Sequence, residues 1–103
     1  MDDSRYQRGL AQIEAISGAH GANVVKSLED IAPDLGRYIV EFAYGDIFAR
    51  PGLDRKTREL ATVAALTAMG TAVAQLKVHM QAALHVGASR QEIIETILQM
   101  IPY

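Results

Sequence analysis

Cysteine and tryptophan are both absent from this chain of 103 residues. Without cysteine there are no disulfides, no thiolate metal sites and no mechanism that needs a cysteine nucleophile. Histidine is also scarce, with three residues in all, so we expect no metal site built from histidines. A chain that uses no disulfides fits a reducing compartment, and the expected location is the cytoplasm.

Neither a strong charge of one sign nor a long apolar run is present. Ten Lys and Arg residues stand against twelve Asp and Glu residues, so the net charge is −2 and the basic surface that nucleic acids require is missing. Charged residues interrupt the apolar stretches well before the roughly 20 residues of a membrane span. Residues 1–5 are acidic on balance and contain no apolar core, unlike a secretory signal. We therefore expect neither a nucleic-acid nor a membrane partner.

The hydrophobic residues that are present are mostly small. They make up 50% of the chain, but only 6% of the chain is aromatic, and alanine fills much of the difference. Alanine favours helices and lets them approach closely, yet it buries little volume. The length predicts a single domain, 1–103, and the thin core predicts that association with further copies completes it.

Apolar residues recur with the period of an α-helix and show no sustained alternation, so the sequence predicts an all-α fold. We expect a small antiparallel bundle of about five to six helices. The helices are predicted at 2–17, about 22–29, from Pro33 to a last turn near 44–46, 55–69, from an N-cap at Thr71 to 86, and from 90 to about 101. A break is predicted at Gly18–Gly21, and the helix that begins at Pro33 is predicted to carry an apolar stripe of Leu35, Tyr38, Ile39 and Phe42.

Local signals bound the last three predicted helices. Asp54 is a good N-cap, Gly70 is a typical helix end, and Ser89 followed three residues later by Glu92 is a capping box. The connections between these helices are very short, so neighbours in sequence must pack antiparallel.

One polar constellation lies in this second half of the chain. Gln75 and His79 share a helix face with Ala82, and Glu59 lies on the preceding helix. Counted from the turn between the helices, Glu59 and His79 differ by roughly 4–5 Å in height, because a helix rises about 1.5 Å per residue. Antiparallel helices lie roughly 8–10 Å apart, a gap that the two side chains can bridge. A carboxylate that orients an imidazole is suited to proton transfer.

Plainer interpretations compete with this one. Glu59 lies in the first turns of its helix, where the helix dipole alone favours a carboxylate, and a single helical histidine is more often structural. Arg58 and Lys77 are interpreted as solvated charges, although either can reach an anion. The remaining candidates are interpreted as surface residues (His20, His85) or as core or subunit contacts (Tyr38, Phe42, Tyr44).

Several segments together resemble the carboxymuconolactone decarboxylase family. They are 28–35 with 41–46, 53–60 with 75–79, and 83–95, so the resemblance covers about residues 28–103. It implies an all-helical fold of the alkylhydroperoxidase D type and an obligate homo-oligomer, a trimer or hexamer. The usual Tyr-Ala-Gly-Phe-Pro continuation and the last helix of the family are missing after Tyr103.

The resemblance also implies which branch of the family this is. The peroxidase branch carries Cys-x-x-Cys-x-x-x-His; here the histidine falls on His79, whereas the cysteine positions fall on Ala72 and Gln75. The family glutamate falls on Glu59 if a gap of one residue is allowed. The sequence therefore resembles the cysteine-free decarboxylases, which convert 4-carboxymuconolactone to 3-oxoadipate enol-lactone in protocatechuate degradation without a cofactor.

The predicted site follows from the constellation and the resemblance together. His79 donates a proton or stabilises an oxyanion, and Glu59 orients His79 or shuttles the proton; the two roles can be exchanged. Gln75 and Arg58 are the candidates for binding substrate oxygens, and no metal is expected. The alternative is a non-catalytic oligomeric helical module or a small-molecule binding protein of the same fold.

Overall fold

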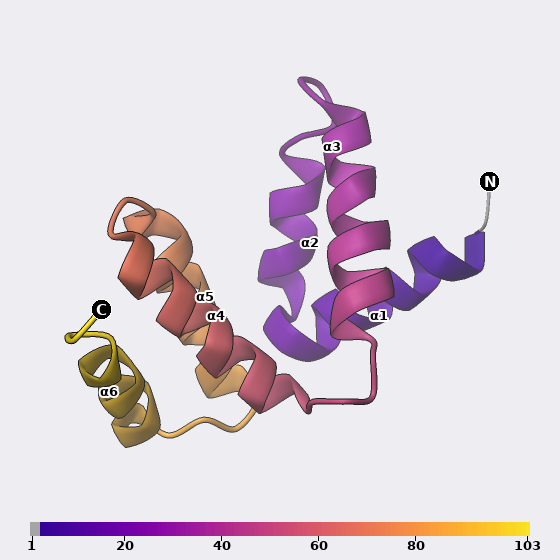
Figure 1. The fold of residues 1–103 in the computed structure, drawn as a ribbon. Coiled ribbons are helices and arrows are strands. Elements are labelled where there is room, and N and C mark those ends of the chain that lie inside the picture. Colours follow the sequence, from indigo (N-terminus) through magenta and orange to yellow (C-terminus); the bar gives the residue numbers. More distant parts are fainter. Residues whose placement is uncertain (1–2) are drawn as a thin grey trace. The chain divides into compact units, whose positions relative to one another are not determined.

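The computed structural model describes residues 3–103, and within them it contains helices and turns but no strand. The chain divides into two compact units, one up to Gly52 and the other from Leu53 onward (Figure 1). The elements are α1 (Asp3–Ser17), α2 (Ala19–Lys26), α3 (Pro33–Tyr38), the π-helix η1 (Ile39–Phe48), α4 (Arg55–Met69), α5 (Val73–His85) and α6 (Arg90–Gln99). The predicted all-α class is confirmed. No helix among residues 3–103 has the length and apolar character needed to cross a membrane.

In the first unit, α1 packs closely against η1. Ile13 and Ile16 of α1 are buried, as is Val40 of η1. The approach is close because glycine lies at the contact on both helices. A Cβ atom at Gly9 would overlap the carbonyl oxygen of Val40, and one at Gly45 would lie 2.7 Å from the carbonyl oxygen of Arg5.

The break after α1 is shorter than predicted. Gly18 alone makes the turn, with a positive φ of 57°, and α2 resumes at Ala19 and ends at Lys26. The prediction that Gly18–Gly21 interrupts the helices, and that the next one spans about 22–29, is therefore wrong. Gly21 lies inside α2. A side chain at this position would overlap Ile13 and Ser17, so the glycine allows α1 and α2 to pack closely.

The next helix begins with Pro33 in its first turn, as predicted, but from Ile39 to Phe48 it is a π-helix. Its buried residues are Val40, Glu41 and Gly45. Tyr38 and Phe42 are more than half exposed, so they are not core residues of this unit, and their role as subunit contacts stays a prediction. Tyr44 is partly buried and stacks on Phe48 with 5.0 Å between ring centroids. From Ile39 onward the inward-facing residues differ from those of the predicted stripe, because the stripe assumed α-helical geometry and a π-helix turns a different set of residues inward.

The second unit consists of α4, α5 and α6 around a small core. Its buried members are Val63, Ala83, Ala88 and Ile93, and the partly buried residues Leu60, Leu76, Met80 and Ile97 pack against them. The predicted ends of α4 are confirmed: the Asp54 side chain accepts a hydrogen bond from the Thr57 N–H at 2.7 Å, and Gly70 is left-handed with φ 71°.

The predicted N-cap of α6 is confirmed, whereas that of α5 is not. Ser89 and Glu92 form the predicted capping box, with hydrogen bonds of 3.0 Å and 2.9 Å. Thr71 does not cap α5, because the N-cap position is Ala72, which makes no side-chain cap. That prediction was wrong by one residue, since Gly70 and Thr71 are both used to turn the chain.

Candidate active site

The candidate site is a hydrogen bond between α4 and α5. Glu59 Oε2 lies 2.8 Å from His79 Nδ1, so the predicted meeting of these side chains is observed. Glu59 lies on α4, whose start is fixed by the Asp54 cap, and His79 lies on α5 after the tight turn at Gly70. The short turn holds the helices antiparallel and sets the two residues at matching heights.

The two partners differ in burial. Glu59 has no exposed surface, whereas the side chain of His79 keeps 16% of its surface exposed. One turn along α4 lies Val63, and one turn along α5 lies Ala83, and both are wholly buried. The carboxylate is therefore enclosed by protein, and the imidazole is the member of the pair that meets the outside.

The hydrogen bond defines which imidazole nitrogen is available. A carboxylate only accepts, so Nδ1 of His79 donates to Glu59 Oε2. The other nitrogen, Nε2, is left to exchange a proton with a bound molecule. A carboxylate behind the imidazole in this way fixes the tautomer and stabilises the charge when the ring gains a second proton.

Glu59 carries a second feature that packing does not explain. Its other oxygen, Oε1, is buried and has no hydrogen-bond partner. A buried polar atom without a partner typically costs stability, and removing a carboxylate from water costs more. An apolar side chain would serve the core better, so the position of Glu59 indicates a functional demand.

Gln75 and Arg58, the other predicted site residues, are neighbours of the pair along the same two helices. Gln75 is one turn before His79 on α5 and is exposed. Arg58 precedes Glu59 and is partly buried; its Nε donates to the carbonyl oxygen of Leu53 at 3.2 Å. His85 and Lys77 are exposed, as is His20 in the first unit. Within residues 3–103 no group of three His, Asp or Glu side chains is arranged to hold a metal ion.

An ion pair joins α4, which carries Glu59, to α6. Lys56 Nζ of α4 lies 2.7 Å from Glu92 Oε2 in the first turn of α6. The bonds from Lys56 and from the Ser89 N–H lower the pKa of Glu92. The pKa of Asp54 is lowered as well, by its hydrogen bonds from Thr57. Sequence reasoning missed the Lys56–Glu92 contact, because it joins helices that are not consecutive.

Fold and site together describe a helical protein in which a buried carboxylate is hydrogen-bonded to a partly exposed imidazole between two antiparallel helices. The model of the carboxymuconolactone decarboxylase family matches residues 33–103, and the chain belongs to this family. It is 35% identical over 103 residues to a 4-carboxymuconolactone decarboxylase of Acinetobacter baylyi, which covers 99% of this chain and 76% of that protein.

Two further relatives are similar to the chain. An uncharacterized 15.0 kDa protein of Paracoccus denitrificans is 40% identical over 95 residues, or 91% of this chain and 71% of that protein. A nitrosuccinic acid decarboxylase of Metarhizium robertsii is 37% identical over 65 residues, or 63% of this chain and 45% of that protein. Two of the three relatives are thus named for the loss of a carboxyl group.

Proposed function

We propose that this chain decarboxylates 4-carboxymuconolactone, or a related small unsaturated lactone, to 3-oxoadipate enol-lactone in protocatechuate degradation. It does so in the cytoplasm, without a cofactor, as a homo-oligomer of three or six subunits. The hydrogen bond between buried Glu59 and partly exposed His79 is the observation that carries the proposal. Family membership supplies the reaction class: the chain is a carboxy-lyase.

The reaction needs an electron sink and a proton. The bond between the carboxylate carbon and the ring carbon breaks, carbon dioxide leaves, and the electron pair passes into the unsaturated lactone as an enolate. A proton must then be added to carbon. The substrate itself is the sink, so the protein has to hold the carboxylate, stabilise the enolate and deliver the proton.

The difference in burial between Glu59 and His79 supports a different role for each, where the sequence left the two roles exchangeable. His79 Nε2 delivers the proton, because the imidazole is the exposed member of the pair. Glu59 is a positioning residue: it accepts from Nδ1 and stabilises the protonated ring before the transfer. Arg58, next to Glu59 on α4, and Gln75, one turn before His79 on α5, are proposed to bind substrate oxygens.

The names of the two decarboxylases suggest a common requirement for the substrate. Nitrosuccinic acid and carboxymuconolactone both carry a carboxyl group that can leave its electron pair to a neighbouring acceptor, a nitro group in one and an unsaturated lactone in the other. A proton donor of the His79 type serves either acid, because the protein contributes the proton and the substrate contributes the sink.

The test is an ultraviolet assay of lactone consumption by the purified chain, with His79→Gln as the control. Turnover by the parent protein that the variant lacks supports the proposal. A folded oligomer that consumes no lactone favours the non-catalytic helical module. Hydroperoxide reduction with a dithiol donor is expected to be absent, because this chain has no thiolate to carry it.

A further inference from the structure

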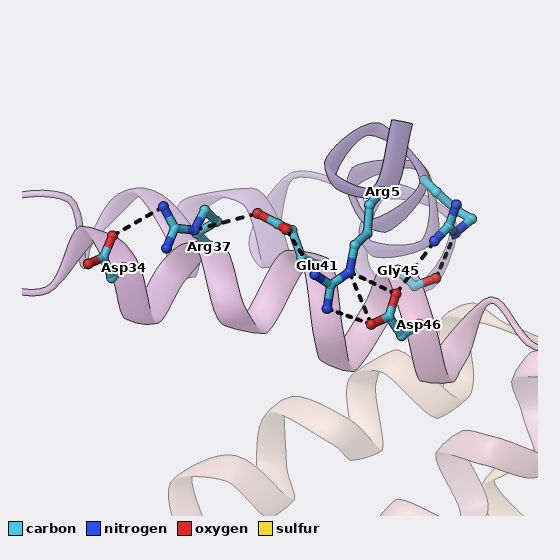
Figure 2. A network of polar contacts seen from close by, with 7 residues as sticks. Arg5, Asp34, Arg37, Glu41, Gly45 and Asp46 are labelled. Carbon is cyan, nitrogen blue, oxygen red and sulfur yellow. Dashed lines mark hydrogen bonds and ion pairs between the residues drawn. The ribbon is translucent and has the colours of Figure 1, made fainter. Parts of the chain in front are cut away.

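A chain of ion pairs runs along α3 and η1 in the first unit, and α1 supplies two of its arginines (Figure 2). The pairs are Asp34–Arg37 at 3.4 Å, Arg37–Glu41 at 3.5 Å, Arg5–Glu41 at 3.4 Å, Arg5–Asp46 at 2.6 Å and Arg8–Asp46 at 3.5 Å. The proposed function uses none of these residues.

The guanidinium of Arg5 binds two carboxylates that are five residues apart. Its Nη2 and Nε atoms hold Asp46, while Nη1 lies 3.4 Å from Glu41 Oε2. In an α-helix, positions five apart point about 140° away from each other, because each residue turns the helix by about 100°. A π-helix bonds residue i to residue i+5 and so brings the two onto one side. The π-helix therefore favours the contact that Arg5 makes with both carboxylates.

A second pair with the same spacing also faces α1. Val40 and Gly45 are both buried, and Gly9 of α1 lies against both: a Cβ at Gly9 would overlap the Val40 oxygen, and one at Gly45 would come within 3.6 Å of the Gly9 nitrogen. Two successive pairs, 40 with 45 and 41 with 46, are thus turned toward α1. The packing of Gly9 against residues 40 and 45 and the ion pairs of Arg5 with residues 41 and 46 therefore favour the same hydrogen-bond register in η1.

The end of η1 shows a competition for one carbonyl group. The Ala49 N–H bonds to Tyr44 O, five residues back, at 3.1 Å. In an α-helix its acceptor would be Gly45 O, four residues back. Here Nε of Arg8 donates to Gly45 O at 2.7 Å. A side chain of α1 thus occupies the oxygen that the α register would use.

Arg37 provides a contrast inside the same network. It lies on α3 and pairs with Asp34, three residues before it, and with Glu41, four residues after it. These are the spacings at which side chains meet on an ordinary α-helix. Arg37 therefore favours the α register, although it binds the same carboxylate as Arg5.

We propose that the packing of α1 against η1, through the ion pairs of Arg5 with Glu41 and Asp46, determines whether residues 39–48 form π-helical or α-helical hydrogen bonds. With Arg5 in place the segment is a π-helix. Without it the segment relaxes to an α-helix, the commoner form, and the side chains at its far end turn relative to those at its start. Long π-helices are rare, so ten residues in this form call for an outside restraint. This inference concerns the first unit and stands apart from the decarboxylase proposal.

The experiment compares the full-length protein with Arg5→Met by NMR, using scalar couplings across backbone hydrogen bonds. In the parent protein the Ala49 nitrogen couples to the Tyr44 carbonyl carbon. In Arg5→Met that coupling is lost and one to the Gly45 carbonyl carbon replaces it. Arg8 is expected to release the Gly45 oxygen in this variant, because Arg8 also pairs with Asp46, which turns away once Arg5 no longer holds it. The matched control is Arg37→Met, which removes the other cation at Glu41 and is expected to keep the coupling to Tyr44.

Two results would overturn the proposal. One is Arg5→Met that keeps the coupling to Tyr44. The other is an Arg37→Met control that shifts as well, which would make neutralisation of Glu41 the cause. If Arg5→Met does not fold, Asp46→Asn takes its place, since it weakens the same contact while preserving the shape of the side chain. A coupling to Tyr44 that persists in Asp46→Asn counts against the proposal in the same way.

Discussion

Glu59 Oε2 and His79 Nδ1 are 2.8 Å apart, and the carboxylate is wholly buried while the imidazole keeps 16% of its side-chain surface exposed. The proposed roles rest on this asymmetry: His79 meets the bound molecule, and Glu59 acts through His79. It also separates the expected effects of changing each residue.

Replacing His79 with glutamine is expected to lower turnover by roughly 10²–10⁴-fold, the typical contribution of a general acid or base. Glutamine keeps a polar group near Glu59 but does not transfer a proton. Lactone consumption measures the loss, and a thermal melt of each variant separates lost catalysis from lost folding. His85→Gln, an exposed histidine on the same helix, is the matched control and retains full turnover. Near-normal turnover in His79→Gln would leave His79 a packing residue.

Glu59→Gln is expected to reduce turnover by a similar factor without lowering the melting temperature. The amide still accepts from Nδ1, but it does not stabilise a protonated ring, and the fold no longer buries a carboxylate. The double variant with His79→Gln is expected to lose little more than the worse single variant, because the two residues act as one unit. Kinetics of the three variants test this, and losses that multiply would indicate separate roles.

The capping box of α6 predicts a dependence of stability on pH. The folded pKa of Glu92 lies below its ordinary value, chiefly because of the hydrogen bond from Lys56. A lowered pKa stabilises the fold above the unfolded pKa, and this contribution is lost as the pH falls through the folded pKa. Melting temperatures from pH 7 to pH 3 are expected to fall more for the parent protein than for Glu92→Gln. Parallel curves would contradict this.

Ser89→Ala tests the same cap independently of pH. The hydroxyl accepts the Glu92 N–H at 3.0 Å, and loss of such a cap typically costs about 1 kcal/mol. Urea unfolding at pH 7 measures the change. A shift in midpoint far below that value would mean that the packing of Ile93 holds the helix start without the cap.

The glycine contact of the first unit predicts a sharp difference between two alanine substitutions. Gly9→Ala places a methyl group on the Val40 carbonyl and is expected to cost about 3 kcal/mol or more. Gly52→Ala meets no atom within 4 Å and is expected to change stability by less than about 0.5 kcal/mol. Denaturant midpoints of both variants give the comparison, and equal midpoints would refute the close crossing.

Assembly can be tested directly by sedimentation. The sparse aromatic content and the exposed apolar side chains of α6 and the residues after it, Leu98, Ile101 and Tyr103, favour association. We expect a trimer or hexamer rather than a species of 11.2 kDa. A monomer at micromolar concentration would contradict the expectation.

The sequence predicted the features that local chemistry determines. Asp54, Gly70 and Ser89 bound their helices because a cap depends on a few neighbouring residues. The contact of Glu59 with His79 was also within reach, since a short antiparallel turn leaves little freedom in height. The full burial of Glu59 was not, because a carboxylate in an early helix turn is usually explained by the dipole.

The π-helix could not be predicted from the sequence, for a different reason. Its register depends on Arg5 and Gly9, which lie more than thirty residues before Val40 and Glu41. A search for a period of 3.6 assigns the apolar side to Tyr38 and Phe42, and no local signal reports contacts made with a distant helix. The single-domain prediction, 1–103, and the substrate-binding roles of Gln75 and Arg58 stay predictions.

The hydrogen bond at Nδ1 also has a stereochemical consequence. With that edge of the ring anchored to an enclosed acceptor, the imidazole of His79 cannot flip, and Nε2 points in one direction. A proton delivered from a fixed atom reaches a planar carbon from one side. When the reaction runs in heavy water, deuterium should therefore enter only one of the two prochiral positions of the new methylene group.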